Sequence, residues 1–484
     1  MSPSVFDPRL EYVTVAETAL SDIDGERGEL VVGGYPIDEL ATNATYEEGV
    51  FLLFEGRLPT AEELADFRAD LASRRELPPA VRELLERAAE TGNSAMDAIR
   101  MGVAAATLET DETDPRTAAE RVVAIVPTIV ATYWRYRQGE EPIEPRDDLG
   151  HAANYLYMLT GEEPTEAETP ALETFLVTLL EHGLNPSTFT ARTVMSTESD
   201  LVSAVTAAVG TFKGPRHGGG LELTVEMLRA VHDSGNGERY VRERLDAGER
   251  IKGFGHPVYQ VRDPRATVLS AATERLVGAT GDDGFLETVR EFETVAGDVL
   301  AERAPERGTE PNVEFYAAAL LRELGLPTEL FTATFAVSRV GGWAAHCLEQ
   351  RETDDLVRPT SQYVGASETA WTPVENRHVA GDSLVRNPVR STALEPVSET
   401  LAVLSEPDRL ELLLLLADRD DPVAYSTLRA SSSIEDKGRF NYHLRQLRDY
   451  FVVRGEDGYG LTDAGRSVVE TVLTDERLLE DLLD

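Results

Sequence analysis

Cysteine is nearly absent from this chain of 484 residues, in which Cys347 is the only one. A single cysteine excludes an intrachain disulfide and any metal site built from several cysteines. We expect Cys347 to be a small buried side chain rather than a nucleophile. Long hydrophobic runs are also missing, because stretches such as residues 410–417 are too short to span a bilayer. No N-terminal segment has the basic flank and apolar core of a secretory signal, so we predict a cytoplasmic protein with no membrane partner.

Lysine is equally scarce. Only Lys213, Lys252 and Lys437 occur, and 46 basic residues stand against 87 acidic ones, which gives a formal net charge of −41. Such a charge repels nucleic acids and anionic membranes at long range. The acidic residues are spread along the chain rather than gathered in a tail, and at about 1 M salt the Debye length falls to about 3 Å. We therefore predict a halophilic, salt-adapted protein; a merely acidic soluble protein is the alternative.

The hydrophobic pattern predicts a mainly α protein. Short strand-like runs closed by glycine and proline are confined to residues 1–45. From Thr45 onward the apolar spacing is helical, and Thr45 and Thr60 are typical of helix N-caps with an acidic first turn. Further predicted helices span residues 95–108, 116–138, 149–159, 169–183, 199–211, 221–233, 238–247, 263–278, 283–303, 312–324 and 328–351.

Three glycine-flanked histidines lie in segments that read as turns before or between helices. The segments are Glu-His-Gly-Leu-Asn-Pro-Ser-Thr at 181–188, Lys-Gly-Pro-Arg-His-Gly-Gly-Gly at 213–220 and Gly-Phe-Gly-His-Pro-Val-Tyr at 253–259. Glycine lets the backbone approach a ligand closely, and loops often carry functional groups. Asn-Val-Glu at 312–314 adds a carboxylate further along. Any one of these histidines is more often structural, but together they indicate an active site.

The third segment runs on to Asp263-Pro264-Arg265 and resembles the signature of the citrate synthase family. Other segments resemble the same family in the same order: 17–25, 33–38, 56–60, 312–316, 335–339 and 358–365. The resemblance covers about residues 8–380. It implies the family's multi-helical fold with a large and a small helical domain, the second at about residues 220–325.

The resemblance implies a role for each residue of the predicted site. Glu314 stands at the position of the catalytic base, which removes a methyl proton from acetyl-CoA. His217 would donate a hydrogen bond to the thioester oxygen, and His256 to the carbonyl of oxaloacetate. No metal or cofactor is needed, since coenzyme A enters as the thioester substrate.

Oxaloacetate is a dianion, and guanidinium groups match carboxylates well. The resemblance places Arg265, Arg339 and Arg358 at the carboxylate-binding arginines and His182 at a further substrate histidine. In the family's homodimer, Arg358 would reach the site of the partner subunit.

Several positions depart from the family pattern. The family's base is an aspartate, and a glutamate extends the carboxylate by about 1.5 Å if the backbone stays in place. Around the expected coenzyme A contacts, Val258, Gln260 and Arg262, a glutamine stands where a basic residue is common and Arg262 is a possible substitute. Glu310 adds a negative charge there, and Leu221 stands at a usual asparagine position.

The C-terminal part resembles the winged-helix domain of archaeal transcription regulators, an α+β unit. Residues 438–447 would form the recognition helix, 452–454 and 459–462 the wing, and 464–466 the start of the last helix. DNA contacts are predicted for Lys437, Arg439, Asn441 and Arg445. The acidic balance of this part argues against strong DNA binding, so a docking or dimerisation module is the alternative.

The predicted organisation is a catalytic domain over residues 1–380, a linker over 381–395 and a winged-helix domain over 396–484. The predicted activity is that of an acyltransferase that condenses acetyl-CoA with oxaloacetate to give citrate. Two alternatives stay open: a 2-methylcitrate synthase that uses propionyl-CoA, and a catalytically weakened transcription regulator that senses a metabolite.

Overall fold

The computed structural model divides the chain into two compact units, Met1–Ser361 and Gln362–Asp484. It describes residues 6–10, 13–108, 114–281, 284–304, 308–353, 355–365, 371, 373–374, 403–417, 419, 422–434, 436–448, 450–455 and 458–469. The predicted linker at 381–395 lies outside these residues. The predicted limits of the small helical domain stay a prediction.

Unit 1 begins with the short strands expected before residue 45. An antiparallel sheet of order β1-β2-β3 is formed by β1 (Ser21–Asp24), β2 (Glu29–Val32) and β3 (Tyr35–Pro36). Its register pairs Ser21 with Val32 and Val32 with Tyr35. The buried side chains of Leu30 and Val32 fix one face of β2 against the helices, because neighbouring residues of a strand point to opposite faces.

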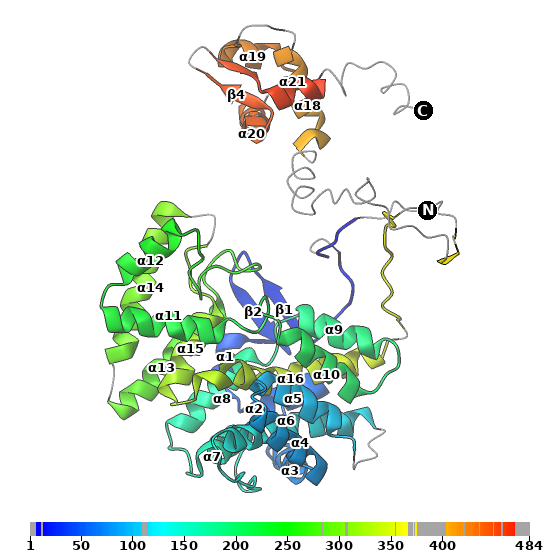
Figure 1. Cartoon of the computed structure of the whole chain (residues 1–484), viewed down its shortest axis with the longest axis vertical. Coiled ribbons are helices and arrows are strands. Elements are labelled where there is room, and N and C mark those ends of the chain that lie inside the picture. The colour runs from blue at the N-terminus through cyan, green and yellow to red at the C-terminus, as the bar shows by residue number, and fades with distance from the viewer. Residues whose placement is uncertain are drawn as a thin grey trace. The chain divides into compact units, whose positions relative to one another are not determined.

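Helices make up the rest of unit 1 (Figure 1). Before α16 they are α1 (Ile37–Asn43), α2 (Tyr46–Glu55), α3 (Ala61–Ser73), α4 (Pro79–Glu90), α5 (Ala95–Ala105), α6 (Pro115–Arg137), α7 (His151–Thr160), α8 (Glu168–Leu179), α9 (Pro186–Met195), α10 (Leu201–Phe212), α11 (Leu221–Ser234), α12 (Gly237–Asp246), α13 (Pro264–Thr280), α14 (Gly284–Arg303), α15 (Val313–Glu323) and the 3-10 turn η2 (Thr328–Leu330). No helix among the described residues is both long and apolar enough to cross a membrane.

Helix α16 (Phe331–Arg351) runs through the core of unit 1. It packs on α2, α6, α8, α9 and α10, and nearly all of its residues are buried. A helix covered on every side must find partners inside the protein for its polar groups. Cys347, which this helix also carries, is buried, and burial raises the pKa of its thiol to about 12, as expected for a packing residue.

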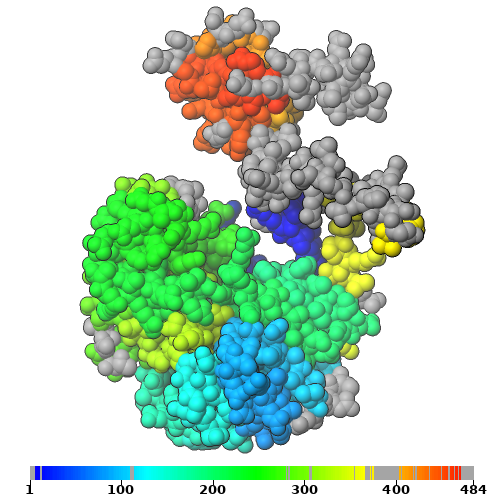
Figure 2. All heavy atoms as spheres, viewed as in Figure 1, coloured from blue at the N-terminus to red at the C-terminus, as the bar shows by residue number. Residues whose placement is uncertain are grey.

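Helices α11, α12, α14 and α15 pack on one another, and α13 joins them to α8 and α1. In the space-filling view they form a lobe, drawn green, that a hollow sets apart from α9 and α10 (Figure 2). The loops before α11 and α13 carry His217 and His256, and the starts of α13 and α15 carry Arg265 and Glu314. The predicted active site therefore depends on how this group of helices meets α8, α9 and α16.

The sequence did not predict helices α1, α4 and α9, and it extended the predicted helices 95–108 and 169–183 too far. Helix α1 lies in the stretch that was expected to form strands and turns. Helices α4 and α9 begin with proline at their first position, Pro79 and Pro186, where the absent N–H is not needed. The predicted helix 169–183 ends at Leu179, and Gly183 turns the chain with a φ of +60° four residues later. That early end frees Glu181 and His182 for the site.

Unit 2 has its own small core, which includes Leu412, Leu428, Phe440 and Leu447. Its elements are η4 (Val403–Ser405), α18 (Pro407–Ala417), α19 (Tyr425–Ser431), α20 (Lys437–Arg448), β4 (Val452–Arg454), β5 (Tyr459–Leu461) and α21 (Asp463–Val468). Strands β4 and β5 form an antiparallel ribbon. The sequence predicted this order of three helices, a ribbon and a last helix; the assignment to winged-helix regulators stays a prediction.

Candidate active site

The loop that carries His256 is tied to the start of helix α15. The N–H of Gly255 donates to the carbonyl of Glu310 at 3.0 Å, and that of Asn312 donates to the carbonyl of Gly253 at 2.8 Å. The Asn312 side chain also donates to Gly255 at 2.9 Å and accepts from the N–H of Glu314 at 2.9 Å, which caps α15. These hydrogen bonds therefore hold the loop of His256 and the start of the helix of Glu314 together.

Backbone donors fix the proton of His256. Its Nδ1 accepts from the N–H groups of Val258 at 3.0 Å and Tyr259 at 3.2 Å, so the proton of the neutral ring must lie on Nε2. Burial and the charge of Arg265 lower the pKa of His256 to about 4. At neutral pH the ring is thus an uncharged Nε2–H donor.

His182 joins His256 in a cluster with Tyr259. The Nε2 atom of His182 lies 3.1 Å from the Tyr259 hydroxyl, and the two imidazole rings are 5.6 Å apart between centroids. Burial, with the charges of Arg265 and Arg339, holds the pKa of His182 well below its usual value. Sequence reasoning had given no role to Tyr259, although it closes the motif of His256.

His217 is oriented by Ser187 at the start of α9. Its Nε2 lies 2.8 Å from the Ser187 hydroxyl and accepts from the Ser187 N–H at 3.3 Å, which leaves the proton on Nδ1. The indole N–H of Trp343 donates to the same hydroxyl at 3.1 Å. Burial and then Arg339 lower the pKa of His217 to about 4, so this ring is also neutral.

Two buried guanidinium groups differ in how their charge is balanced. Arg265 forms a two-pronged pair with Asp263, Nε to Oδ1 at 3.0 Å and Nη2 to Oδ2 at 2.8 Å, and its Nη2 lies 3.5 Å from His256. Arg339 donates Nε–H to the carbonyl of Leu179 at 2.7 Å and has no carboxylate within ion-pair distance among the described residues. Burial lowers the pKa of Arg339 to about 10. A buried cation without a bound anion is suited to an anionic ligand.

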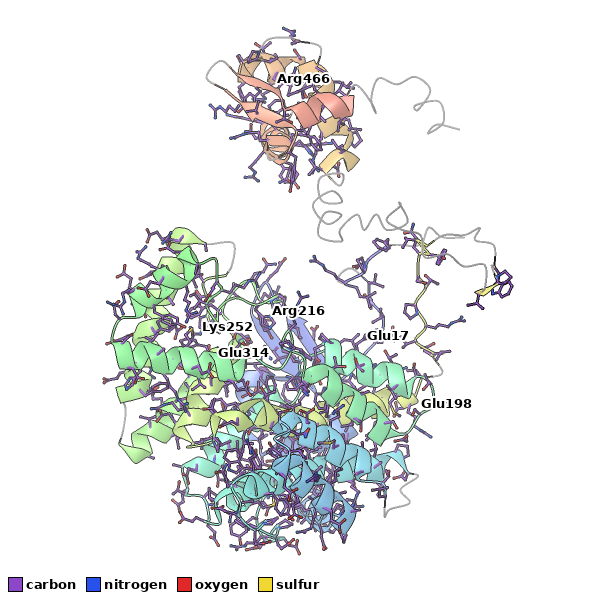
Figure 3. All side chains as sticks on the ribbon, viewed as in Figure 1. Glu17, Glu198, Arg216, Lys252, Glu314 and Arg466 are labelled. Atoms are coloured by element: carbon purple, nitrogen blue, oxygen red, sulfur yellow. The ribbon has the colours of Figure 1, made fainter. Side chains whose placement is uncertain are left out.

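Glu314 presents a free carboxylate. Among the described residues no donor is hydrogen-bonded to it, and only its backbone N–H is held, by Asn312. Burial raises the pKa of Glu314 although the charges of Lys252 and Arg265 act in the opposite direction. Figure 3 labels Glu314 and Lys252. A raised pKa makes a carboxylate a stronger base, provided that it is ionised.

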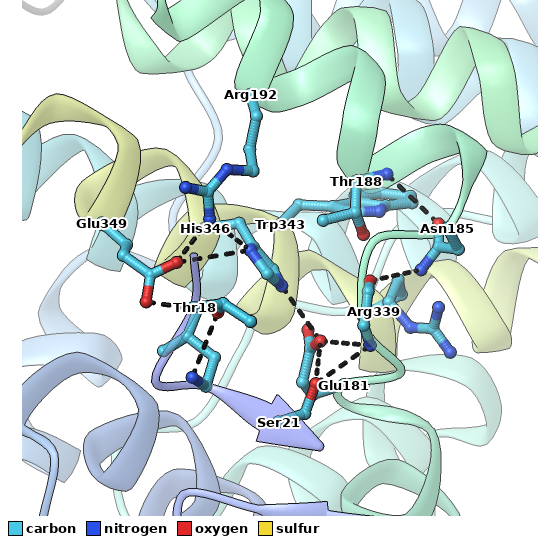
Figure 4. Close-up of polar contacts among 12 residues, drawn as sticks. Thr18, Ser21, Glu181, Asn185, Thr188, Arg192, Arg339, Trp343, His346 and Glu349 are labelled. Atoms are coloured by element: carbon cyan, nitrogen blue, oxygen red, sulfur yellow. Dashed lines mark hydrogen bonds and ion pairs between the residues drawn. The ribbon is translucent and has the colours of Figure 1, made fainter. Parts of the chain in front are cut away.

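A buried polar network surrounds Glu181, the residue before His182 in the sequence (Figure 4). Oε1 of Glu181 accepts from the Ser21 hydroxyl at 3.0 Å, the Gly183 N–H at 2.6 Å and Nε2 of His346 at 3.0 Å. His346 in turn accepts at Nδ1 from Arg192 at 3.0 Å, which leaves its Nε2–H to donate to Glu181. Sequence reasoning did not find this network, and the only signal for it was the acidic residue before His182.

One face of α16 contacts the residues that hold His182 and His217 in place. Arg339, Trp343, His346 and Glu349 follow one another at intervals of three or four residues, which places them on the same side of a helix. Through these contacts α16 holds the loop of His182 by way of Glu181 and the ring of His217 by way of Ser187.

The side chains of the remaining predicted ligands form no hydrogen bond or ion pair with this cluster among the described residues. Arg358 is exposed and has no partner among the described residues. Val258 and Gln260 are exposed on the loop after His256. Arg262 donates to the Thr267 hydroxyl at 3.1 Å and forms an ion pair with Glu293, so it already has protein partners.

In unit 2, all four predicted DNA contacts are exposed on α20. Lys437, Asn441 and Arg445 are exposed on α20, with the amide oxygen of Asn441 accepting from the Tyr425 hydroxyl at 2.7 Å. Arg439 is held in a two-pronged pair with Asp408, at 2.6 and 3.0 Å.

Known proteins resemble this chain over most of unit 1. The family model described as citrate synthase, C-terminal domain, matches residues 9–360. The citrate synthase of Haloferax volcanii is 44% identical over 378 residues, which cover 76% of this chain and 98% of the relative. The 2-methylcitrate synthase of Shewanella oneidensis is 34% identical over 368 residues, 75% of this chain and 96% of the relative.

A solved structure agrees with these relatives. The ternary complex of citrate synthase from Thermoplasma acidophilum with carboxymethyl coenzyme A and oxaloacetate superposes with a TM-score of 0.69 at 29% identity, covering 76% of this chain and 98% of the other. In unit 2, residues 397–472 match a family model described as a domain of unknown function, DUF7347. On the extent of the match over unit 1, the chain belongs to the citrate synthase family.

Proposed function

We propose that unit 1 catalyses the condensation of acetyl-CoA with oxaloacetate to give citrate and coenzyme A. The observation that carries the proposal is the grouping of His182 and His256 with the buried Arg265, together with a second neutral imidazole, His217, and a carboxylate free to take a proton. Members of the family need no metal or cofactor for this reaction, because hydrogen-bond donors and cations supply the stabilisation.

In the proposed first step, the Glu314 carboxylate removes a proton from the methyl group of acetyl-CoA. The electron pair of the broken C–H bond moves towards the thioester oxygen, where the Nδ1–H of His217 donates a hydrogen bond to the resulting enol or enolate. A neutral imidazole suits this task, because it already carries the Nδ1–H that donates the hydrogen bond and no proton transfer has to come first.

In the second step, the nucleophilic carbon attacks the ketone carbon of oxaloacetate and forms the new C–C bond. The ketone oxygen gains negative charge, which the Nε2–H of His256 stabilises by a hydrogen bond; the oxygen takes this proton to become the hydroxyl of citrate, the His256 ring regains a proton from solvent, and Glu314 releases the proton that it removed from the methyl group. Arg265, Arg339 and His182 would hold the two carboxylates of oxaloacetate. Water then cleaves the C–S bond of the citryl thioester and releases citrate and the free thiol of coenzyme A.

The direct test is release of coenzyme A thiol when the purified protein is mixed with acetyl-CoA and oxaloacetate in high salt. We expect turnover that needs both substrates and that falls about 100-fold or more in His256→Ala and Glu314→Gln. Absence of thiol release from the wild-type protein, at any salt concentration that keeps it folded, would contradict the proposed function.

Propionyl-CoA is the alternative substrate, since a 2-methylcitrate synthase is among the relatives. Rates with acetyl-CoA and propionyl-CoA at equal concentration distinguish the two activities. We expect the acetyl thioester to have the higher kcat/KM, and the reverse order would assign 2-methylcitrate formation.

We also propose that two chains form a homodimer in which Arg358 completes the site of the partner. Its support is the exposure of Arg358, for which no hydrogen bond or ion pair is found among the described residues. Mixing inactive Arg358→Ala with inactive Glu314→Gln under subunit exchange tests this: mixed dimers would regain part of the activity. No regain, with exchange proven by mass, would place Arg358 outside a shared site.

For unit 2 we propose DNA binding through α20, as part of a regulator that responds to oxaloacetate or citrate. Lys437, Asn441, Arg445 and Arg448 share one helical face, and the last three line a cavity of about 330 Å³. A pool of random duplex DNA, with and without oxaloacetate, tests the proposal. Retention that Arg445→Ala weakens and Arg419→Ala does not would support it, and no retention in either state would favour a docking module.

The cytoplasmic location and the salt adaptation also stay predictions.

A further inference from the structure

Three successive glycines follow His217, and each has a different neighbour. A Cβ atom at Gly218 would lie closer than 3.0 Å to Phe212, whereas one at Gly219 would meet only the Cα of Pro215, at an ordinary 3.5 Å. A Cβ atom at Gly220 would lie closer than 3.0 Å to both carboxylate oxygens and to Cδ of Glu314. Of these three glycines, Gly220 is therefore the one whose missing side chain makes room for the carboxylate.

Backbone conformation does not explain the glycine at 220. Gly220 is the N-cap residue of α11, with a φ of −94° and a ψ of −25°. These angles lie in the right-handed region that any residue adopts, so an alanine would not be strained by them. The reason for glycine at this position is space.

The carboxylate that uses this space is longer than an aspartate would be. The Glu314 backbone is fixed by the cap at Asn312, whose side chain accepts its N–H at 2.9 Å, so the side chain cannot gain room by a shift of that turn alone. We infer that Gly220 is a positioning residue for Glu314, and that the open space at Gly220 is what allows a glutamate to act as the base in this chain. This inference rests on the proposed role of Glu314.

A methyl group at position 220 should act on the base and not on the rest of the site. It would push the carboxylate by about 1 Å, and a displacement of that size can lower a rate by about 100-fold. In a Glu314→Asp variant the shorter side chain would end about 1.5 Å closer to α15 and leave the methyl group at an ordinary contact distance. The effect of Gly220→Ala should therefore depend on which carboxylate stands at position 314.

A double-mutant cycle with Gly220→Ala and Glu314→Asp tests this dependence. We expect Gly220→Ala to lower kcat about 100-fold in the presence of Glu314 but only about twofold in the presence of Glu314→Asp. The KM for oxaloacetate should stay within about twofold in all four proteins. A mere loss of folded protein would lower kcat by the same factor with glutamate and with aspartate at position 314. Gly219→Ala, one residue away and with room for its methyl group, is the matched control and should change kcat by about twofold at most.

Equal losses from Gly220→Ala in both backgrounds would overturn the inference. Thermal midpoints of the same four proteins give a readout without catalysis: Gly220→Ala should lower the midpoint with Glu314 and much less with Glu314→Asp. If Gly220→Ala does not fold, recovery of folding in the double variant supports the coupling, and continued misfolding contradicts it. A wild-type protein that releases no thiol would reject the proposed function, whereas the thermal cycle would still decide the coupling.

Discussion

At the scale of single residues, backbone amides decide which nitrogen of each imidazole carries its proton. His256 accepts at Nδ1 from two N–H groups, and His217 accepts at Nε2 from Ser187. The two rings therefore offer opposite nitrogens as donors, and both are neutral because burial lowers their pKa to about 4. Substrate oxygens on two sides can then be held without a proton transfer beforehand.

The hydroxyl of Ser187 helps to orient the His217 ring, and the loss of this hydroxyl should have a measurable effect on kcat. Ser187→Ala keeps the backbone N–H but leaves His217 with one partner fewer and the Trp343 indole N–H unpaired. Loss of a buried hydrogen bond of this kind costs about 1–3 kcal/mol, so we expect kcat to fall about tenfold with little change in KM for oxaloacetate. Ser73→Ala, on the exposed end of α3, is the control, and an equal effect of both variants would exclude a role for Ser187.

The pH dependence of the rate should report Glu314. Its raised pKa means that the carboxylate gains its proton, and loses its function as base, at a higher pH than an ordinary glutamate. His217 and His256 stay neutral through this range, because their pKa values are about 4. We expect the acid side of the kcat profile to show one ionisation above the usual glutamate value of about 4.3. A midpoint at or below that value would contradict the assignment.

Protein stability should change with pH in the opposite sense to the effect of Glu314 alone. Burial lowers the pKa of His151, His182, His217 and His256, so the unfolded chain binds protons on these residues that the folded chain does not. The contribution of these histidines to the free energy of unfolding is complete above about pH 6.5 and is lost as the pH falls towards about 4. We expect the free energy of unfolding to decrease over this range, and a constant value between about pH 7 and pH 5 would show that these rings are not buried as described.

The resemblance of several motifs to the citrate synthase family named the three histidines, the arginines and Glu314 as site residues, and their roles stay predictions. The resemblance was not enough to find Ser187, Glu181 or Gly220. These three act through contacts with residues distant in the sequence, such as Trp343, His346 and Glu314. Such contacts depend on how helices meet and leave no local pattern in the chain.

At the scale of elements, the cap of α15 has two functions. The Asn312 side chain donates to the loop of His256 through the carbonyl of Gly255, and it accepts the N–H of Glu314 at the start of α15. We expect Asn312→Ala to cost about 1–2 kcal/mol of stability, as for other N-caps, and to lower kcat beyond the change seen in Thr60→Ala. Thr60 caps α3 in the same manner but lies on the exposed surface. Unfolding by urea in high salt measures the first effect, and equal kcat values for the two variants would contradict the second.

The prediction of elements failed where termini depend on tertiary contacts. Helix α8 ends early because Glu181 is drawn into the polar network of α16, through His346, which lies 165 residues further along the chain. Helix α16 can approach this turn because Gly342 has no side chain. A Cβ atom there would lie closer than 3.0 Å to the carbonyl of Leu180. Periodicity found the long helices, since their apolar faces repeat locally, but it carries no information on such close approaches.

At the scale of the whole molecule, negative charge is the dominant feature. The formal net charge of −41 is distributed over both units, and the ion pairs of the described residues are mostly exposed pairs of arginine with a carboxylate. Exposed pairs contribute only about 0–1 kcal/mol each, so they do not offset the repulsion among the excess carboxylates. The relative from Haloferax volcanii agrees with a protein adapted to salt.

Screening of this repulsion should make the protein more stable in salt. The Debye length shortens from about 10 Å at 0.1 M to about 3 Å at 1 M, which removes most repulsion between exposed charges. Relief of a few kcal/mol would raise the thermal midpoint by about 5 °C or more for a unit of this size. We expect the midpoint to rise with KCl over this range but not with sucrose at equal osmolality, because sucrose does not screen charge. A midpoint that is constant or falls with KCl would show that the surface carboxylates are not the source of instability, and a rise in both solutes would assign the effect to solute exclusion from the protein surface instead.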